Sequence, residues 1–323
     1  MPNVRLRFVA VLLPIAVLIP ITSIATQPAA KAAAHAATAP LSVTVNQGEV
    51  ARWPGVAAKT CLLGQKKYAA VDSVCYYPFD VEAKAGRYPI GVIDQDGKRH
   101  NATVIVERVD WPKVDITLPN DTYINVTPEN QKRALREREE VLKLFVFKDE
   151  APRFSLPFAA PSSPLPKNEN DFGSQRTFNA KVESQHTGRD YPVNAGTPVK
   201  AIADGKVVLV GEQFLTGNSV YIDHGDGLVS ASFHMTDVSV KQGDEVKRGT
   251  TIGKVGATGR TSGAHLHLGL RWLAARVDPQ PLLESPLRLH DVGETPAATE
   301  RKDEKAKSEP KESNASIRRD QEG

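Results

Sequence analysis

The second half of the chain consists of short β-rich runs separated by glycine turns, and this pattern restricts the fold more than any other feature. No long amphipathic helix interrupts the runs, so we expect an antiparallel sheet that curls around an open groove over residues 170–289. The runs are GTPVKAIADGKVVLVG (196–211), NSVYIDHGDGLVSASFHM (218–235), GDEVKRGTTIGKVG (243–256) and AHLHLGLRW (264–272).

Residues 41–110 show a similar alternation of β-rich runs and turns. Asp96-Gly97 lies between two runs with alternating apolar residues and indicates a hairpin. We expect an immunoglobulin-like β-sandwich here, which makes the chain mainly β. No constellation of catalytic residue types occurs in this accessory region. The runs are LSVTV (41–45), RYPIGVI (87–93) and HNATVIVERV (100–109).

Residues 111–169 are expected to connect the two β regions. Thr127 before Pro128 is a typical helix start, and the apolar residues that follow have helical spacing up to about residue 147. Five prolines after this helix indicate a stiff linker. These apolar residues are Ala134, Leu135, Val141, Leu142 and Phe145. At the other end, residues 290–323 contain almost no apolar side chains, so we expect a disordered tail.

The first 36 residues have the order of a secretory signal peptide. Two arginines precede an apolar stretch, and small residues then offer cleavage after Ala32 or Ala36. The alternative is an uncleaved membrane anchor, because the apolar stretch is slightly long for a signal core. Both alternatives predict an exported protein that is periplasmic, associated with the cell envelope, or secreted. No cysteine lies at a cleavage site, which argues against a lipoprotein.

Charge and cysteine content narrow the class of protein further. The formal charge of +3 results from 41 basic and 38 acidic residues, and three of the basic ones lie in the predicted signal peptide. The remaining chain is near neutral, so nothing favours nucleic acid as a partner. Cys61 and Cys75 are the two cysteines of the chain and are expected to form a disulfide, worth about 3 kcal/mol in the chain-entropy model.

The residues with catalytic chemistry fall in three short segments of the second half. Because residues two apart in a strand point to the same face, His265 and His267 should project together. Zinc in a hydrolytic site takes three nitrogen or oxygen ligands and leaves a position for water. His186, Asp190 and one member of the His265/His267 pair could supply these ligands. The other member and His234 would then be available for proton transfer.

Each of these motifs is weak alone, since a His-x-His pair can simply lie on a wet strand face. Their occurrence together in one glycine-rich β region is the informative observation. The remaining histidines lie in the predicted signal peptide, the first β region, a turn and the edge of the tail, and we interpret them as structural or incidental. They are His35, His100, His224 and His290.

From about Phe172 to Pro281 the chain resembles the M23 family of zinc endopeptidases, also called the lysostaphin or LytM type. The family pattern of H-x-x-x-D, x-x-H and H-x-H is present in order and spacing, as are its flanking segments GTPVKAIADGKV and VKQGDEVKRGTTIGKVGATGRTSGAHLHLGL. The resemblance implies cleavage of peptide cross-links in bacterial peptidoglycan, with one Zn²⁺ per chain. It implies the ligands His186, Asp190 and His267, the catalytic histidines His234 and His265, and Asn218 near the substrate groove.

Departures from the family pattern are modest and concern substrate preference more than catalysis. Ser232, Met235 and Leu268 stand where many members have other residues. One alternative function is a non-catalytic regulator that binds the cell wall or an amidase, although such members typically lack metal ligands. The other alternative is an exported β protein with incidental histidines. No wall-targeting repeat is visible, which favours a D-Ala to meso-diaminopimelate bond over a glycine bridge.

Overall fold

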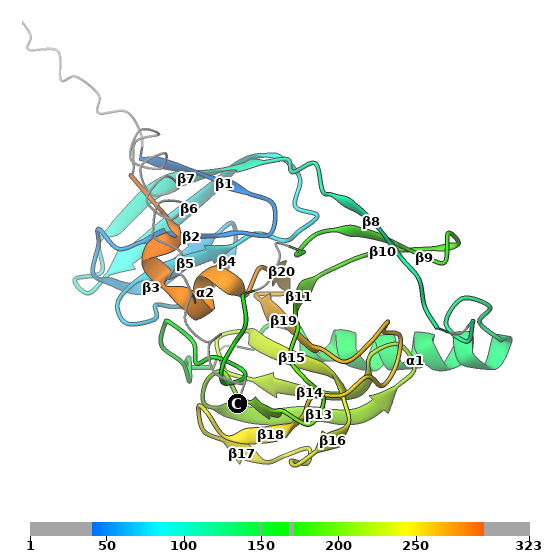
Figure 1. Ribbon diagram of the computed structural model, residues 1–323. Helices are drawn as coiled ribbons and strands as arrows, with labels where there is room; N and C mark the ends of the chain where they lie inside the picture. Colours follow the sequence, from blue (N-terminus) through cyan, green and yellow to red (C-terminus); the bar gives the residue numbers. More distant parts are fainter. Residues whose placement is uncertain (1–40, 120, 149, 168–170, 294–323) are drawn as a thin grey trace, which may run out of the picture. The chain divides into compact units, whose positions relative to one another are not determined.

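The computed structural model describes residues 41–119, 121–148, 150–167 and 171–293 (Figure 1). The predicted signal peptide at 1–36 lies outside these residues. In the described part, strands in five sheets dominate and helices are few, so the prediction of a mainly β protein is confirmed. None of the helices in these ranges combines the length and apolarity that a membrane span requires.

Two sheets form the first β region, which we call the sandwich. The predicted hairpin is present, because Asp94 N donates to Lys98 O at 3.0 Å and Gly97 adopts a φ of +82° in the turn. One sheet has the order β1 (Ser42–Asn46), β7 (Arg99–Glu107), β6 (Gly86–Asp94), β3 (Ala58–Leu63) and β4 (Lys66–Ala69). The other has the order β21 (His290–Asp291), β2 (Val50–Trp53) and β5 (Cys75–Pro78).

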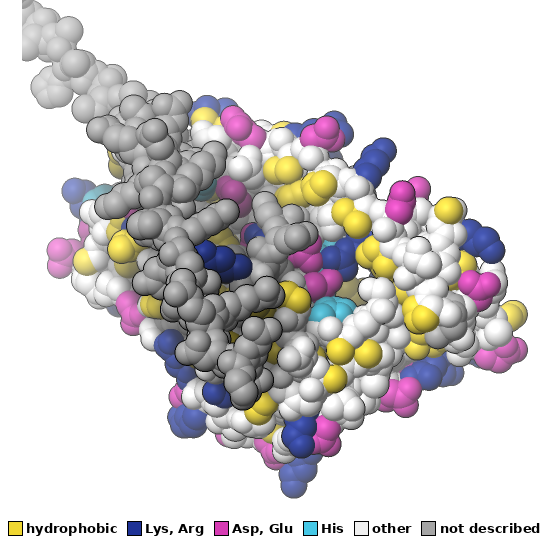
Figure 2. Space-filling view, viewed as in Figure 1, with side chains coloured by type: hydrophobic (Ala, Val, Ile, Leu, Met, Phe, Trp, Pro, Cys, Tyr) yellow, Lys and Arg dark blue, Asp and Glu magenta, His cyan; other side chains and the backbone are white. Residues whose placement is uncertain are grey.

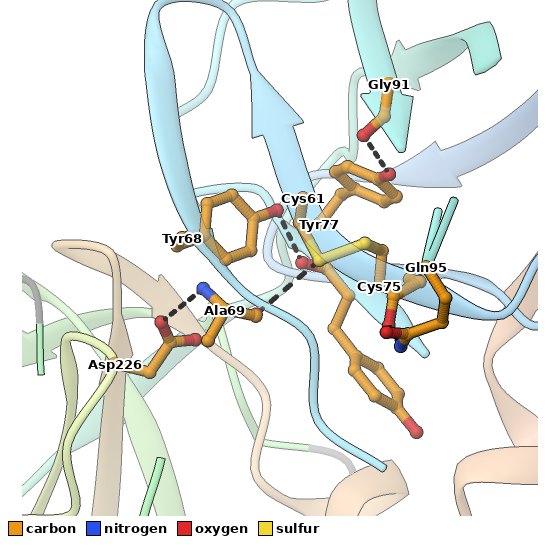
Figure 3. The surroundings of a disulfide bond; sticks show 10 residues. Cys61, Tyr68, Ala69, Cys75, Tyr77, Gly91, Gln95 and Asp226 are labelled. Carbon is orange, nitrogen blue, oxygen red and sulfur yellow. Dashed lines mark hydrogen bonds between the residues drawn. A yellow bond between two sulfur atoms is a disulfide. The ribbon is translucent and has the colours of Figure 1, made fainter. Parts of the chain in front are cut away.

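A disulfide between Cys61 in β3 and Cys75 in β5 joins the two sheets (Figure 3). Both cysteines are fully buried, and their Cα atoms are 5.5 Å apart. Close by, the Tyr77 hydroxyl donates to Gly91 O at 2.8 Å, which ties β5 to β6. The sandwich is therefore fixed internally by one covalent link and by hydrogen bonds from tyrosines.

Helix α1 (Pro128–Leu144) begins where the sequence predicts, since the Thr127 side chain accepts a hydrogen bond from Asn130 N at 3.3 Å. The apolar residues of its last turn, Val141 and Leu144, pack on strands of the largest sheet. Leu135 and Leu142 are exposed, so the predicted apolar face of the helix is only partly buried.

A three-stranded sheet that the sequence did not predict connects the two halves. Its order is β10 (Val182–Gln185), β9 (Gln175–Phe178) and β8 (Lys113–Ile116). Strand β8 comes from the segment expected to be linker, and it pairs in parallel with β9. The segment that follows β10, which contains His186, is thereby attached to the chain that leaves the sandwich.

The largest sheet runs through the second half, and Figure 1 shows its central strands side by side. Its order is β11 (Gly188–Tyr191), β19 (Leu266–Trp272), β15 (Leu228–Met235), β14 (Gly217–Asp223), β13 (Gly205–Gln213) and β17 (Glu245–Val246), with β20 (Ala275–Val277) paired to β19. A smaller sheet contains β12 (Pro198–Lys200), β18 (Thr251–Lys254) and β16 (Asp237–Val238). The short helix α2 (Gln280–Glu284) and the 3₁₀ turn η1 (Pro286–Arg288) follow.

The start of the predicted tail requires a correction. Residues 290–293 are described, and β21 pairs in parallel with β2 of the sandwich. Leu289 and Val292 are buried, and Arg52 donates to Asp291 at 2.6 Å. Two apolar anchors and one ion pair thus order a segment whose composition alone indicated disorder. The rest of the predicted tail, 294–323, lies outside the described residues.

Candidate metal centre

Strand pairing brings Asp190 and His267 together, because they face each other in the antiparallel register of β11 and β19. Directly opposed residues project from the same face of a sheet. Gly188 makes the close approach possible: a Cβ at this position would lie 2.6 Å from His267 Nε2 and 2.5 Å from Leu268 O. The neighbouring Arg189 points to the other face, where Nε donates to Asp278 Oδ1 at 2.8 Å.

His186 lies between β10 and β11 and is held by its own backbone. His186 N donates to Ser174 O at 2.8 Å, and Gly173 N donates to His186 O at 2.8 Å. In the ring, Nδ1 is 3.0 Å from Asp171 O, so a proton on Nδ1 is donated to this carbonyl. The lone pair then resides on Nε2, the atom that faces Asp190 and His267.

Three potential ligand atoms converge within 4.8 Å of one another, from His186, Asp190 and His267. His186 Nε2 is 3.2 Å from Asp190 Oδ1 and 3.1 Å from His267 Nδ1. The separation of His267 Nδ1 and Asp190 Oδ1 is 2.8 Å. Ligand atoms about 2.0–2.1 Å from a tetrahedral zinc ion would be about 3.3 Å apart, so this donor set fits zinc with little adjustment.

Arg176 and Asp171 support this cluster, and sequence reasoning missed both. Arg176 Nη1 donates to Asp190 Oδ2 at 2.8 Å, and its Nη2 donates to Asp171 Oδ2 at 2.9 Å. Asp190 Oδ1 is thereby directed to the imidazoles. Burial opposes ionisation of Asp190, but hydrogen bonds with His186, His265 and His267 hold its pKa far below the usual range. The carboxylate is therefore charged and ready to bind a cation.

A β-bulge in β15 directs the His234 side chain towards the cluster of His186, Asp190 and His267. The register between β14 and β15 shifts between the pairs Asn218–Met235 and Val220–Ser232, which leaves one extra residue in β15. His234 has a φ of +61°, an uncommon value for a non-glycine residue, and both it and the preceding Phe233 line a groove together with His186, Asp190 and His267.

The His234 ring is oriented and neutral. Nδ1 donates to Thr258 O at 2.7 Å, which leaves Nε2 as an acceptor. Burial, with repulsion from His267 and His265, lowers the pKa of His234 to about 3. The Phe233 ring stacks on His267 at 4.9 Å between centroids with an 8° angle, and so fixes the plane of that imidazole.

His265 precedes β19, bridges to Gly256 and projects into the groove with His267, as alternation predicts. Its Nδ1 donates to Gly263 O at 2.9 Å, and its Nε2 is 3.4 Å from Asp190 Oδ1. The ring centroids of His265 and His234 are 5.0 Å apart. Two imidazoles thus flank the convergent ligand atoms.

One groove of about 720 Å³ is lined by all five of these residues: His186, Asp190, His234, His265 and His267. Figure 2 shows histidine surface in a hollow beside acidic and basic side chains. Asn218 is not among the residues that line this groove, and its side-chain amide donates to Met235 O at 2.9 Å. A second hollow of about 740 Å³, lined by Trp111 and neighbouring polar residues, contains no histidine.

His35 lies outside the described residues, whereas two other histidines interpreted as structural, His100 and His224, lie away from the cluster. His224 is fully buried, with Nδ1 2.8 Å from Asp204 O and Nε2 2.8 Å from Ser230 Oγ. Burial lowers its pKa to about 4. In the sandwich, His100 Nε2 is 2.7 Å from Asp94 Oδ2. Neither residue lines the groove.

A protein-family model matches the part of the chain that contains this cluster. Residues 184–279 match the model of peptidase family M23, so the chain contains an M23 peptidase domain. This range includes all five groove residues named above. We call residues 184–279 the M23 domain.

Curated relatives match over the same part of the chain. The chain is 42% identical over 97 residues to the DD-carboxypeptidase/endopeptidase Mpg of Neisseria meningitidis, covering 30% of this chain and 21% of the relative. It is 41% identical over 90 residues to the peptidoglycan DD-endopeptidase ShyA of Vibrio cholerae, covering 28% and 21%. The matches therefore span about a fifth of the length of these relatives.

One solved structure matches most of the described chain. It is a crystal structure of an M23 peptidase candidate from Pseudomonas aeruginosa, with 28% identity and a TM-score of 0.55. The match covers 73% of this chain and 94% of that chain, so it extends beyond the M23 domain.

Proposed function

We propose that this protein is a zinc-dependent endopeptidase that hydrolyses peptide cross-links of bacterial peptidoglycan. The observation that carries the proposal is the convergence of His186 Nε2, Asp190 Oδ1 and His267 Nδ1 in a groove that two further imidazoles also line. The name of the similar Vibrio protein, a peptidoglycan DD-endopeptidase, supports a peptidoglycan substrate, and the Neisseria protein is named a DD-carboxypeptidase/endopeptidase.

Zinc fits this donor set, and the match to the M23 family favours it over other metals. Two imidazole nitrogens and one carboxylate oxygen are the ligands of many catalytic zinc sites, in which the fourth position stays open. Arg176 and Asp171 would act as outer partners, since they orient Asp190 and His186. When bound, zinc would polarise the scissile carbonyl and lower the pKa of a water molecule towards about 7.

Two imidazoles of the protein, those of His234 and His265, would orient the attacking water and stabilise the negative charge that develops on the scissile carbonyl. His234 keeps an unprotonated Nε2 because its Nδ1 donates to Thr258 O, so Nε2 can accept a hydrogen bond from the attacking water and hold it in place. His265 lies beside it, with its Nδ1 donating to Gly263 O, and in the doubly protonated ring its Nε2–H can donate to the developing oxyanion. Both histidines would also orient the water for attack.

The same proposal includes export to the periplasm or cell envelope, where peptidoglycan lies. The signal-like order of residues 1–36 and the disulfide between Cys61 and Cys75 support it, because disulfides persist in oxidising compartments. Cleavage of a fusion between residues 1–60 and a reporter, checked by N-terminal sequencing, would test this part separately.

The activity is tested with purified sacculi. The chain without residues 1–36 should release soluble muropeptides, and a chelator should abolish the release until zinc is restored. Mass spectrometry of the products identifies the bond. Metal analysis should find one zinc per chain. A folded protein with bound zinc that released nothing from sacculi would contradict the endopeptidase proposal.

A further inference from the structure

Arg260 lies in the wall of the groove, on the short loop that leads to His265. The loop is anchored: Arg260 N donates to Leu215 O at 2.8 Å, and Thr261 Oγ1 is 3.2 Å from His265 Nδ1. Gly259 supplies a φ of +77° at the turn. The position of Arg260 is therefore set by the same loop that sets one of the proposed catalytic histidines.

The guanidinium of Arg260 is oriented but has few polar contacts. Its Cζ lies 4.3 Å from the centroid of the Phe178 ring, and its Nη2 is 3.4 Å from Ser184 Oγ. The second distance is longer than an ordinary hydrogen bond, for which about 2.7–3.2 Å is usual. Stacking occupies a face of the guanidinium and leaves its in-plane N–H groups available to an acceptor.

Arg260 differs in this respect from most buried and half-buried arginines of the described chain, and it shares the lack of an acidic partner with Arg271. Burial, with repulsion from Arg176, lowers its pKa, and no carboxylate of the described residues forms an ion pair with it. A partly desolvated cation without an acidic partner is unfavourable unless an anion arrives. The arginines with acidic partners are Arg52 with Asp291, Arg176 with Asp171 and Asp190, Arg189 with Asp278, and Arg276 with Asp80 and Glu82.

The charge balance of the groove points the same way. Its two lining acids, Asp171 and Asp190, both bond to Arg176 and are in contact with His186. Lys167 is the other cationic residue of the lining and is exposed. Both acids of the lining are therefore bonded to Arg176, and neither forms an ion pair with Arg260, which lies in the same groove as the centre that would hydrolyse a peptide.

We infer that Arg260 binds a carboxylate of the peptide substrate, so that the enzyme prefers acidic stem peptides to uncharged glycine bridges. The inference rests on the proposed endopeptidase function and specifies its substrate class. A guanidinium binds a carboxylate through two parallel hydrogen bonds, a geometry that the stacking on Phe178 leaves accessible. A glycine bridge has no side-chain carboxylate and cannot use this contact.

The test uses two synthetic cross-linked stem peptides that differ in one respect: the carboxylates are free in one and amidated in the other. The zinc-loaded chain should cleave the free peptide with a kcat/KM at least about 10-fold higher. Arg260→Gln should reduce this preference to less than about threefold, mainly through loss of cleavage of the free peptide. Its zinc content should be unchanged.

Arg271→Gln is the matched control. Arg271 also stacks on a phenylalanine, with its Cζ 4.3 Å from the Phe145 centroid, but it does not line the groove with the metal cluster. The control should keep the preference of the wild type. Equal losses on both peptides in Arg260→Gln, or no loss on either, would overturn the inference.

A binding measurement separates this inference from the proposed function. Calorimetry on the chelated protein, which cannot cleave, should show at least about 10-fold tighter binding of the free peptide, and Arg260→Gln should lose this difference. A wild type that binds both peptides equally, or binds neither, overturns the role of Arg260. A wild type that prefers the free peptide in binding but cleaves neither peptide when zinc-loaded overturns only the proposed activity.

Discussion

The sandwich and the M23 domain bury different kinds of side chain, although one hydrophobic cluster runs through both. Among the described residues of 41–110, Arg52 is the one charged side chain that is buried, and it is paired with Asp291. The M23 domain instead buries four histidines, an arginine and an aspartate. They are His186, Arg189, His224, Asp226, His234 and His267.

This difference indicates that the two regions are stabilised by different interactions and that the candidate site depends on those of the M23 domain. Burying polar groups is costly unless they find partners, so a region that buries many of them must hold each in a specific network. In the M23 domain these networks orient the proposed metal ligands. The sandwich is stabilised by apolar packing and a disulfide, so substitutions in it should alter the free energy of unfolding rather than metal binding.

The largest effect is expected at the proposed metal ligands. Asp190→Ala removes the carboxylate at the centre of the cluster, so zinc should be lost and activity should fall at least about 10³-fold. His265→Ala should lose activity but keep most of the metal. Metal analysis and muropeptide release measure both. If His265→Ala bound no zinc and His267→Ala did, the roles of these two histidines would be reversed.

A stability effect should follow from breaking the disulfide. Replacing Cys61 and Cys75 by serine should lower the free energy of unfolding by about 3 kcal/mol, because the unfolded chain gains freedom. Zinc content of the folded variant should not change, since neither cysteine lies in the M23 domain. Urea unfolding measures the first effect, and the reduced wild type should reproduce it. A loss of zinc from the folded variant would contradict the division between the two regions.

Arg176→Gln should give an intermediate effect on metal binding. Without the guanidinium, Asp190 loses the bond that directs Oδ1 to the imidazoles, and zinc affinity should fall about 10- to 100-fold. Competition with a fluorescent chelator measures the affinity. Arg248→Gln, at an exposed position outside the groove, is the control and should bind zinc as the wild type does. Unchanged affinity in Arg176→Gln would show that Asp190 needs no such support.

The smallest effect is a pH dependence that arises at His224. Its pKa is about 4 in the folded state because it is buried, against about 6.5 in the unfolded chain. The unfolded state therefore binds more protons between these values, so stability is complete above pH 6.5 and declines as pH falls towards 4. Titration of His224 should lower the free energy of unfolding by about 2 kcal/mol when the pH falls from 7 to 5.

The measurement compares the pH dependence of unfolding free energy in the wild type and in His224→Asn. Between pH 7 and pH 5 the unfolding free energy of the variant should change less with pH than that of the wild type, whatever its value at pH 7. Asp204 and Asp223 are the nearby acids that favour the charged imidazole, and Arg153 opposes it. Equal slopes would show that His224 does not titrate on unfolding.

The sequence predicts those parts of the site that depend on local pattern. The alternation of His265 and His267 and the glycine-bounded strands suffice to predict a sheet with both imidazoles in one groove. The choice of His267 as a ligand came from the family resemblance and stays a proposal.

Other features depend on contacts between distant segments and have no local signal. Arg176 reaches Asp190 only because β8, β9 and β10 pair, and β8 is too exposed and short to show an alternating pattern. The bulge at His234 depends on its register with β14. The strand at 290–291 depends on Arg52 and on burial of Val292 against the sandwich.

The pairing of β21 with β2 has a consequence for protein engineering. The sandwich takes its edge strand from the segment that follows the M23 domain, so the two regions are interleaved along the gene. Neither region can therefore be replaced as a single continuous segment of sequence without affecting the other. A chimaera in which another peptidase domain replaces the M23 domain must keep residues 289–293 after the replaced segment, or the sandwich will lack strand β21.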